Sequence, residues 1–466
     1  MSYLNSVYKY LPPILQDVAT SLVGFKFDRI KYTKFTYDYL KFLMESQYFD
    51  ESERKEFNVK KLEEICKYAK NNSTYYNKKF YDINFDNNIS LDDIPILEKQ
   101  EFRKNLDLIY TKNNEKLWTS HTSGTSGTPL KAFFTYTDFQ KRMAHLLRLY
   151  SWYGLDNDFV KASFTGRLIV NENYVGERFY RYNYVRKQAL FSSHHLNEDN
   201  LIKYVHSLNE IKPNLIEGIA SSIFVIAKFI VDNNLRIDRP PNVVICTSET
   251  LFEDFRKIIE QAFRSKVCNL YGSQEGATIA YECPDGGFHI CEESGIIECK
   301  NEIRDESKLG KLIITSFDSK ATPLIRYNIG DVGALNNNVC SCGRTLKLLD
   351  RIEGRVDDMF FTEDKGVITR LDSAFKGVPS IIKKSQIVQL TLNQFLLKIV
   401  PNESKKIDEK YIKLIIKNLK KYLGPNNQIN IQIVEDIPKE NSGKYKMMVS
   451  KISSDLKQSK WNNTVN

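Results

Sequence analysis

The chain reads SSIFVIAKFIVDNN at 221–234, PNVVICTS at 241–248, LFEDFRKIIEQAF at 251–263 and KVCNLYG at 266–272. Apolar residues recur at helical spacing in the first and third stretches, whereas the second and fourth are short β-branched and apolar runs that indicate buried strands. Helices that alternate with such strands indicate an α/β domain with a largely parallel sheet. Ligands of such sheets bind at the carboxyl ends of the strands.

This alternation extends from about residue 117 to 335, and different patterns flank it. Residues 1 to about 100 contain helical patterns such as VKKLEEICKYAKNN. After 358, SQIVQLTLNQFLLKIV predicts a strand pair, IDEKYIKLIIKNLKKYL predicts a helix that stops at Gly424 and Pro425, and QINIQIVED predicts a strand. We therefore predict a large multilayer α/β domain with mostly parallel sheets over 1–353, joined at 354–358 to a small α+β domain over 359–466.

The composition limits the classes of partner. The 466 residues are 42% hydrophobic and carry a net charge of +9, from 67 basic and 58 acidic residues. The excess forms no basic stripe interleaved with aromatics, so a nucleic-acid partner is not expected. No apolar run approaches the roughly 20 residues of a membrane span, and the N-terminus lacks the pattern of a signal peptide. We expect a cytoplasmic protein whose oligomeric state the sequence leaves open.

The segment LPPILQDVATSLVGFKF at 11–27 is mildly amphipathic. We expect it to form a helix that packs on its own domain, and contact with a membrane surface is the alternative.

A loop rich in hydroxyl groups and glycine lies within HTSGTSGTPLKAFFT at 121–135. Its glycines let the backbone approach phosphate oxygens, and its amides and hydroxyls donate hydrogen bonds to them. The alternative is an ordinary polar turn. Pro129 stands where a Walker loop needs its second glycine, which argues against a P-loop ATPase. The predicted phosphate-binding residues are Thr122, Ser123, Gly124, Thr125, Ser126, Gly127 and Thr128.

Five of the eight cysteines, Cys283, Cys291, Cys299, Cys340 and Cys342, stand close to His289 in the sequence. Three thiolates and one imidazole make a tetrahedral structural Zn²⁺ site, for which we select Cys283, His289, Cys340 and Cys342. Replacement of His289 by Cys291 is one alternative, and a set of small buried thiols without metal is the other.

Further motifs follow the hydroxyl-rich loop in a fixed order: NLYGSQEG at 269–276, IRYNIGD at 325–331, EGRVDD at 353–358 and IPKENSGKYKM at 437–447. Together they resemble the acyl-adenylate-forming superfamily of acyl-CoA ligases, peptide-synthetase adenylation domains and luciferases. With ECPDGGFHI at 282–290 and CSCGR at 340–344, the sequence most resembles phenylacetate-CoA ligases and their relatives in capsular polysaccharide biosynthesis.

The resemblance implies an enzyme that uses ATP and Mg²⁺ to convert a carboxylic acid into an acyl-adenylate. It implies Glu275 as the Mg²⁺ ligand, Lys444 as the cation that contacts the α-phosphate and the carboxylate, and Arg355 as a ribose contact. The remaining implied roles are the adenine side for Tyr271 and Gly272, ATP binding for Ser273, and the ribose hydroxyls for Asp331. The resemblance also implies that 354–358, with Asp357, is a hinge that makes the small domain mobile. Taken alone, Asp331 could equally be a helix cap. Gln274 and Asn328 depart from the usual residues of these motifs.

We expect the acyl group to lie against IEGIASSIFVIAKF at 216–229, where Gly218, Ala220 and Ser221 leave room, and near His194 or His195. Purely structural roles for these residues are the alternative. The acceptor implied by the resemblance is CoA, and the alternative is an amine on a sugar or amino acid in surface polysaccharide biosynthesis. A non-catalytic scaffold is disfavoured because Glu275, Asp331, Arg355 and Lys444 are all present.

Overall fold

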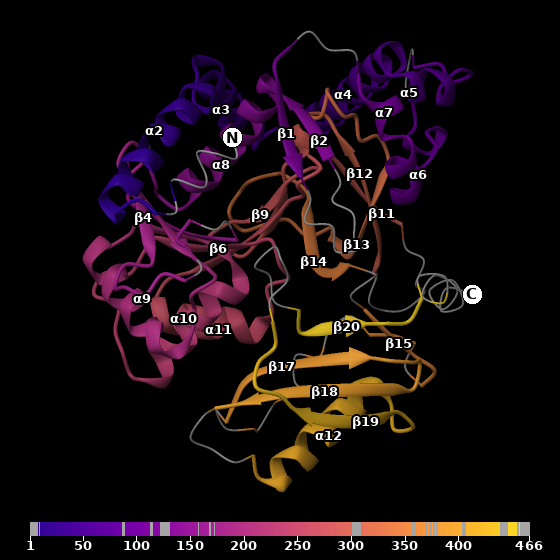
Figure 1. Ribbon diagram of the computed structural model, residues 1–466. Coiled ribbons are helices and arrows are strands. Elements are labelled where there is room, and N and C mark those ends of the chain that lie inside the picture. The colour runs from indigo at the N-terminus through magenta and orange to yellow at the C-terminus, as the bar shows by residue number, and fades with distance from the viewer. Residues whose placement is uncertain are drawn as a thin grey trace.

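The computed structural model is drawn in Figure 1. It describes residue 8 and residues 10–456, apart from 86–88, 112–114, 122–130, 157, 167–168, 172, 301–308, 356–358, 365, 369–370, 372–374, 376–377, 379–380, 403–406, 439–445 and 454–455.

A 12-stranded sheet forms the centre of the large domain, in the order β11-β12-β13-β14-β10-β9-β8-β7-β6-β3-β5-β4. Its parallel part consists of β5 (Gln188–Ser192), β3 (Lys161–Thr165), β6 (Leu215–Ile219), β7 (Val243–Thr247) and β8 (Val267–Tyr271). The crossovers are α9 (Glu198–Ile211), α10 (Ala220–Asp232) and α11 (Glu253–Phe263). The predicted α/β fold is confirmed.

Helices cover both faces of these strands, because successive side chains on a strand point to opposite faces. Ile216 and Val244 belong to a core shared with α9, α10 and α11. Leu215 and Val243 belong to a second core on the other face, shared with α8 (Tyr136–Trp152). This two-sided burial explains why the strands are nearly continuous apolar runs.

The sheet continues beyond β8 in antiparallel strands: β9 (Ala280–Glu282), β10 (Phe288–Ile290), β14 (Leu348–Arg355), β13 (Tyr327–Asn336), β12 (Gly310–Ser316) and β11 (Gly295–Lys300). At the opposite edge β4 (Tyr180–Asn183) is antiparallel to β5. The parallel arrangement expected from the sequence therefore holds for the five strands from β8 to β5 in the sheet order.

The predicted helical start is present as α2 (Pro13–Lys31), α3 (Lys34–Ser46), α4 (Glu51–Asn72), α5 (Thr74–Lys79), η1 (Leu91–Asp93), α6 (Lys99–Lys104) and α7 (Leu106–Ile109). Asp50 caps α4 by accepting a 2.8 Å hydrogen bond from the amide of Glu53. Figure 1 shows α4 to α7 beside β11 and β12, with which they share a core. The hairpin of β1 (Leu117–His121) and β2 (Lys131–Thr135) lies above the sheet.

The C-terminal part contains a separate sheet in the order β19-β18-β17-β20, seen at the bottom of Figure 1. The predicted strand pair is β17 (Ile382–Gln389) and β18 (Gln394–Pro401), the helix is α12 (Glu409–Leu423), and the last predicted strand is β19 (Gln428–Ile433). Gly424 ends α12 with a φ of 100°. A two-stranded sheet of β15 (Phe360–Thr362) and β16 (Gly366–Ile368) precedes this sheet in the chain, and β20 (Met448–Ser450) completes the four-stranded sheet.

Candidate functional site

The carboxyl end of β8 brings together three residues from distant motifs. The Tyr271 hydroxyl donates a 2.8 Å hydrogen bond to Oδ2 of Asp331. Asp331 lies on β13 directly opposite Arg355 on β14. The side chain of Arg355 lies outside the described residues, but strand pairing places its backbone beside Asp331. The fold thus gathers these predicted nucleotide contacts at the edge where loops of a parallel sheet form sites.

The loop that carries Glu275 is fixed from several sides. The carbonyl of Gly276 accepts hydrogen bonds of 2.8 Å from the Ser316 hydroxyl and 2.7 Å from the Ser319 hydroxyl. Gly276 has a φ of +96°, and a Cβ there would lie 2.3 Å from the ring of Phe134. Only glycine fits this position.

Glu275 itself is 4% exposed. Among the described residues its carboxylate makes no hydrogen bond or ion pair, although Arg142 acts on it electrostatically. A buried carboxylate is costly unless a cation accompanies it. This environment fits a carboxylate that binds a divalent cation.

Arg142 was not predicted from the sequence. It extends from α8, its Nη2 donates a 3.0 Å hydrogen bond to the carbonyl of Ser273, and its guanidinium lies 5.5 Å from the centre of the Phe134 ring on β2. Burial lowers the pKa of Arg142, against the opposing effect of Asp318 and Asp138. Arg142 therefore joins the loop of Glu275 to the hairpin that flanks the hydroxyl-rich loop.

A row of charged side chains on α8 surrounds Arg142. Oδ1 of Asp318 forms an ion pair with Nζ of Lys141 at 2.9 Å, and Oδ2 lies 3.8 Å from Nε2 of His145. One turn further along, Arg148 pairs with Glu293 at 2.8 Å. The spacings of four and three between Lys141, His145 and Arg148 predict that these side chains share one face of the helix. The spacings do not identify the acidic residues with which they pair.

Three predicted features lie outside the described residues: the loop Thr122–Thr128, the hinge residue Asp357 and the catalytic lysine Lys444. The backbone of the hairpin on either side of the loop is described, with His121 of β1 paired to Lys131 of β2.

The proposed acyl-pocket residues lie within β6 or just after β5 and β6. Gly218 pairs with Phe164 of β3, and a Cβ on Gly218 would lie 2.1 Å from the Phe164 carbonyl oxygen. Its small size thus serves strand packing. Ala220 and Ser221 are buried at the start of α10, where the Ser221 amide donates a 3.0 Å hydrogen bond to Glu249.

The two adjacent histidines have different environments. His195 is buried, with its ring nitrogens 2.7 Å from the Ser192 hydroxyl and 2.9 Å from the Asn171 carbonyl. His194 is exposed and lies 3.2 Å from the carbonyl of Gly166. Of the two, His194 has the side chain that can meet a ligand.

Asn328, one of the two departures from the family motifs, has structural partners. The Asn328 side chain donates a 3.0 Å hydrogen bond to Glu98 and accepts one of 3.1 Å from the Gly330 amide. It thereby orders the turn before Asp331.

The four selected metal ligands form one cluster, in which the ligand atoms of Cys283, His289, Cys340 and Cys342 all lie within 4.8 Å of one another. The sulfurs of Cys283 and Cys340 are 3.6 Å apart, and Cys342 Sγ lies 3.3 Å from Nε2 of His289. Thiolates around tetrahedral Zn²⁺ lie about 3.8 Å apart, given Zn–S bonds of about 2.3 Å. The donor set and its spacing fit zinc.

The surroundings of the cluster favour the ligand forms of two members, His289 and Cys342, whereas burial raises the pKa of Cys283 to about 12. Burial lowers the pKa of His289 to about 4, which keeps the imidazole neutral at physiological pH. Burial raises the pKa of Cys342, but hydrogen bonds from Arg344 outweigh it and leave the pKa below its ordinary value. A Cβ on Gly287 would lie 2.4 Å from Cys340 Sγ, so a glycine is required there.

The alternative ligand Cys291 is not part of this cluster. Cys291 is fully buried near Arg148 and Tyr281, and its amide donates to the carbonyl of Ile279. Only one residue separates it from His289, and β10 ends between the two.

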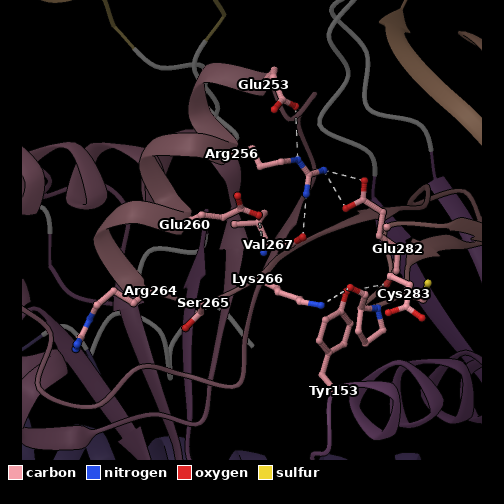
Figure 2. A pocket seen from close by; sticks show the side chains of 13 residues that line it. Tyr153, Glu253, Arg256, Glu260, Arg264, Ser265, Lys266, Val267, Glu282 and Cys283 are labelled. Carbon is pink, nitrogen blue, oxygen red and sulfur yellow. Dashed lines mark hydrogen bonds and ion pairs between the residues drawn. The ribbon is translucent and has the colours of Figure 1, made fainter. Parts of the chain in front are cut away.

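Figure 2 shows a surface cavity of about 830 Å³ between α11 and the turn that follows β9. It lies at the amino end of β8, and its central cation, Arg256, is committed to both carboxylate oxygens of Glu282 at 2.7 and 2.9 Å and to the Val267 carbonyl at 2.9 Å. Lys266 donates to the carbonyl of Pro284 at 2.6 Å. These contacts hold α11 against the turn that carries Cys283.

Comparison with known proteins adds three findings about the sequence. The family described as the CapK C-terminal domain matches residues 360–451. "Protein CapK" of Staphylococcus aureus is 31% identical over 462 residues, which cover 96% of this chain and 100% of that protein. The phenylacetate-coenzyme A ligase of Thermus thermophilus is 32% identical over 34% of this chain and 38% of its own.

Two further likenesses are more distant. The indoleacetate–lysine synthetase of Pseudomonas savastanoi is 26% identical over 52% of this chain and 60% of its own. A crystal structure of 2-hydroxyisobutyryl-CoA ligase in the postadenylation state superposes with a TM-score of 0.67 at 16% identity, over 87% of this chain and 91% of the other. That structural likeness concerns the fold. In the described part of the chain, no helix is long and apolar enough to cross a membrane.

Proposed function

Since this chain belongs to the family of Protein CapK in the acyl-adenylate-forming superfamily and is an adenylate-forming ligase, we propose that it activates a carboxylic acid with ATP and then transfers the acyl group to CoA. The observation that carries this proposal is the contact of Tyr271 with Asp331 at the strand edge that also bears Glu275. Motifs far apart in the sequence converge there.

The first half-reaction joins a carboxylate oxygen of the acid to the α-phosphorus of ATP, and the bond to the leaving pyrophosphate breaks. In the second, the CoA thiol attacks the acyl carbonyl carbon and AMP leaves. Asp331, oriented by Tyr271, accepts hydrogen bonds from the ribose hydroxyls, and Arg355 supplies a further ribose contact. The loop Thr122–Thr128 donates to the phosphates, and Lys444 contacts the α-phosphate and the carboxylate. Catalysis then rests on positioning and on charge stabilisation.

Mg²⁺ would be held by Glu275, whose buried carboxylate suits a hard cation. The ion would neutralise charge on the phosphates. Arg142 helps to keep the loop of Glu275 in place through the Ser273 carbonyl.

Zn²⁺ would be held by Cys283, His289, Cys340 and Cys342, which fill all four positions of a tetrahedral site and leave none for a substrate. Its role would be structural: it would clamp the turn after β9 to the connection between β13 and β14. Because β13 and β14 carry Asp331 and Arg355, this clamp would support the nucleotide side of the site from a distance.

The segment 354–358 is proposed as the hinge between a domain of residues 1–353 and a mobile domain of residues 359–466. Gly354 has a φ of +109°, a conformation suited to a backbone that changes direction. Beyond this segment Met359 and Phe361 pack against Val332 of β13 in a small core that joins the two domains. A contact of this size is compatible with rotation between the half-reactions. We place the protein in the cytoplasm.

An amine acceptor is the second candidate, favoured by the match to indoleacetate–lysine synthetase. In that case an amino group on an amino acid or sugar attacks the same carbonyl carbon, as would suit a role in surface polysaccharide biosynthesis. The acyl pocket in either case lies near Gly218, Ala220, Ser221 and His194.

The test is pyrophosphate release from ATP with a panel of aryl, hydroxy, fatty and amino acids, each with and without CoA. We expect release with one class of acid and acceleration by CoA. If pyrophosphate release requires an acid, is unchanged by CoA and is accelerated by an amine, the second candidate would replace the first. A protein that releases pyrophosphate with none of the acids would contradict both.

A further inference from the structure

Helix α2 packs on the large domain through its polar face. Asp17 and Gln16 are 1% and 2% exposed, and they accept hydrogen bonds from Arg178 and Arg181 respectively. Asp17 also accepts a 2.8 Å hydrogen bond from the amide of Tyr182 on β4. Figure 1 shows α2 at the outer edge of the domain, beside that strand. The expectation that this helix packs on its own domain is confirmed, but the buried face is the polar one.

Close packing fixes the rotation of the helix about its axis. A Cβ on Gly24 would lie 2.3 Å from the side-chain nitrogen of Asn183, so α2 approaches β4 as closely as a glycine allows. Further along, Asp28 pairs with Arg186 at 2.7 Å. Because Asp17, Gly24 and Asp28 all share the face toward β4, the opposite face must point outward.

That outward face is apolar. Ile14 is 71% exposed, Val18 47%, Leu22 66% and Phe25 46%. Spacings of four, four and three place these side chains in one stripe along the helix, which we call the α2 stripe. A contiguous exposed stripe of this kind marks an interaction site, because burying it is favourable.

The charges around the α2 stripe identify its partner. The acidic residues of α2, Asp17 and Asp28, both face inward and are paired with arginines. The exposed charged residues, Lys26 and Arg29, are basic, and the Arg29 guanidinium lies 4.5 Å from the centre of the Phe25 ring. A second copy of the chain would bring like charges together, whereas an anionic lipid surface complements them.

We propose that α2 docks on the surface of a bilayer containing anionic phospholipid. The α2 stripe enters the boundary between headgroups and acyl chains, and Lys26 and Arg29 contact the phosphates. Since the polar face of the helix is already held by Arg178 and Arg181, docking orders no new segment. The large domain is thereby placed on the membrane with its active site intact.

The test is flotation of the full-length protein with vesicles. We expect binding to vesicles of phosphatidylglycerol and phosphatidylcholine mixed in equal parts, little binding to pure phosphatidylcholine, and weaker binding as salt is raised. The double variant Val18→Gln/Leu22→Gln changes exposed residues only, so it should keep its fold while its binding falls at least about tenfold. Lys26→Gln and Arg29→Gln should each weaken binding roughly fivefold.

The matched control is Val339→Gln, which changes an apolar side chain that is 88% exposed and lies outside α2. It should bind vesicles as the wild type does. Equal binding to both kinds of vesicle, no binding, or full binding by the double variant would overturn the proposal. A dimer in sedimentation without vesicles, lost in the double variant, together with no flotation, would assign the α2 stripe to a second copy instead.

Discussion

The phenol of Tyr271 donates a 2.8 Å hydrogen bond to Oδ2 of Asp331, although 60 positions separate the two residues in the chain. If Asp331 binds the ribose, Tyr271→Phe should raise the KM for ATP roughly tenfold, because a hydrogen bond to a charged group contributes about 1.5 kcal/mol. The turnover number should change less. Steady-state kinetics with ATP varied measure both, and Tyr81→Phe, at an exposed tyrosine, is the control. An unchanged KM would remove Tyr271 from nucleotide binding.

Arg142 should control the cation dependence of the enzyme. In Arg142→Lys the contact with the Ser273 carbonyl loses its guanidinium, and the loop of Glu275 loses one of its supports. We expect the Mg²⁺ concentration at half-maximal rate to rise roughly tenfold, about 1.4 kcal/mol. Arg236→Lys, at an exposed arginine, should have no effect. A Mg²⁺ titration that is unchanged in Arg142→Lys would show that this contact is dispensable.

The metal cluster should contain about one equivalent of zinc per chain after purification without chelator. Cys342→Ser should lose the metal and lower the melting temperature, since a structural site contributes directly to folding. Cys299→Ser is the matched control, because Cys299 lies on β11 outside the cluster. Elemental analysis and thermal melts give the answer. A metal-free wild type with an unchanged melting temperature in Cys342→Ser would discard the zinc site.

Acid stability should depend on the buried pair of Glu293 and Arg148. Burial raises the pKa of Glu293, but the Arg148 guanidinium outweighs it and holds the pKa at about 2, below the ordinary 4.5. The pair therefore contributes stability above about pH 4.5 and loses it as the pH falls toward 2.

Glu293→Gln should cost about 3 to 5 kcal/mol at neutral pH, because it leaves the Arg148 guanidinium buried without a counter-charge. The free energy of unfolding, measured by denaturant titration from pH 7 to pH 3, should converge for the two proteins as the pH falls. Parallel curves would exclude Glu293 as the titrating group.

The sequence predicts the elements of this fold well where their signal is local. The helices and strands between 221 and 272 follow from apolar spacing, and the turn after β8 follows from its glycines. The ligands Cys340 and Cys342 are recognisable because they stand two positions apart.

Long-range pairings leave no such signal. The strands β9 and β10 have three residues each, and β10 is held in the sheet by β14, about sixty residues further along. Arg142 is an ordinary helix residue until the fold places it beside Ser273, 131 positions away. The burial of the Asp17 side chain could not be predicted from the sequence either, because it depends on arginines beyond residue 170. Each of these features requires the three-dimensional arrangement.

The most direct test of adenylate formation is exchange of labelled pyrophosphate into ATP, measured without CoA in the presence of the preferred acid. The account predicts acid-dependent exchange by the wild type and by Lys421→Ala, a control at an exposed lysine of α12. It predicts nearly complete loss of exchange in Lys444→Ala with the fold intact. Exchange by Lys444→Ala at the wild-type rate, or its absence in the wild type with every acid, would contradict the account.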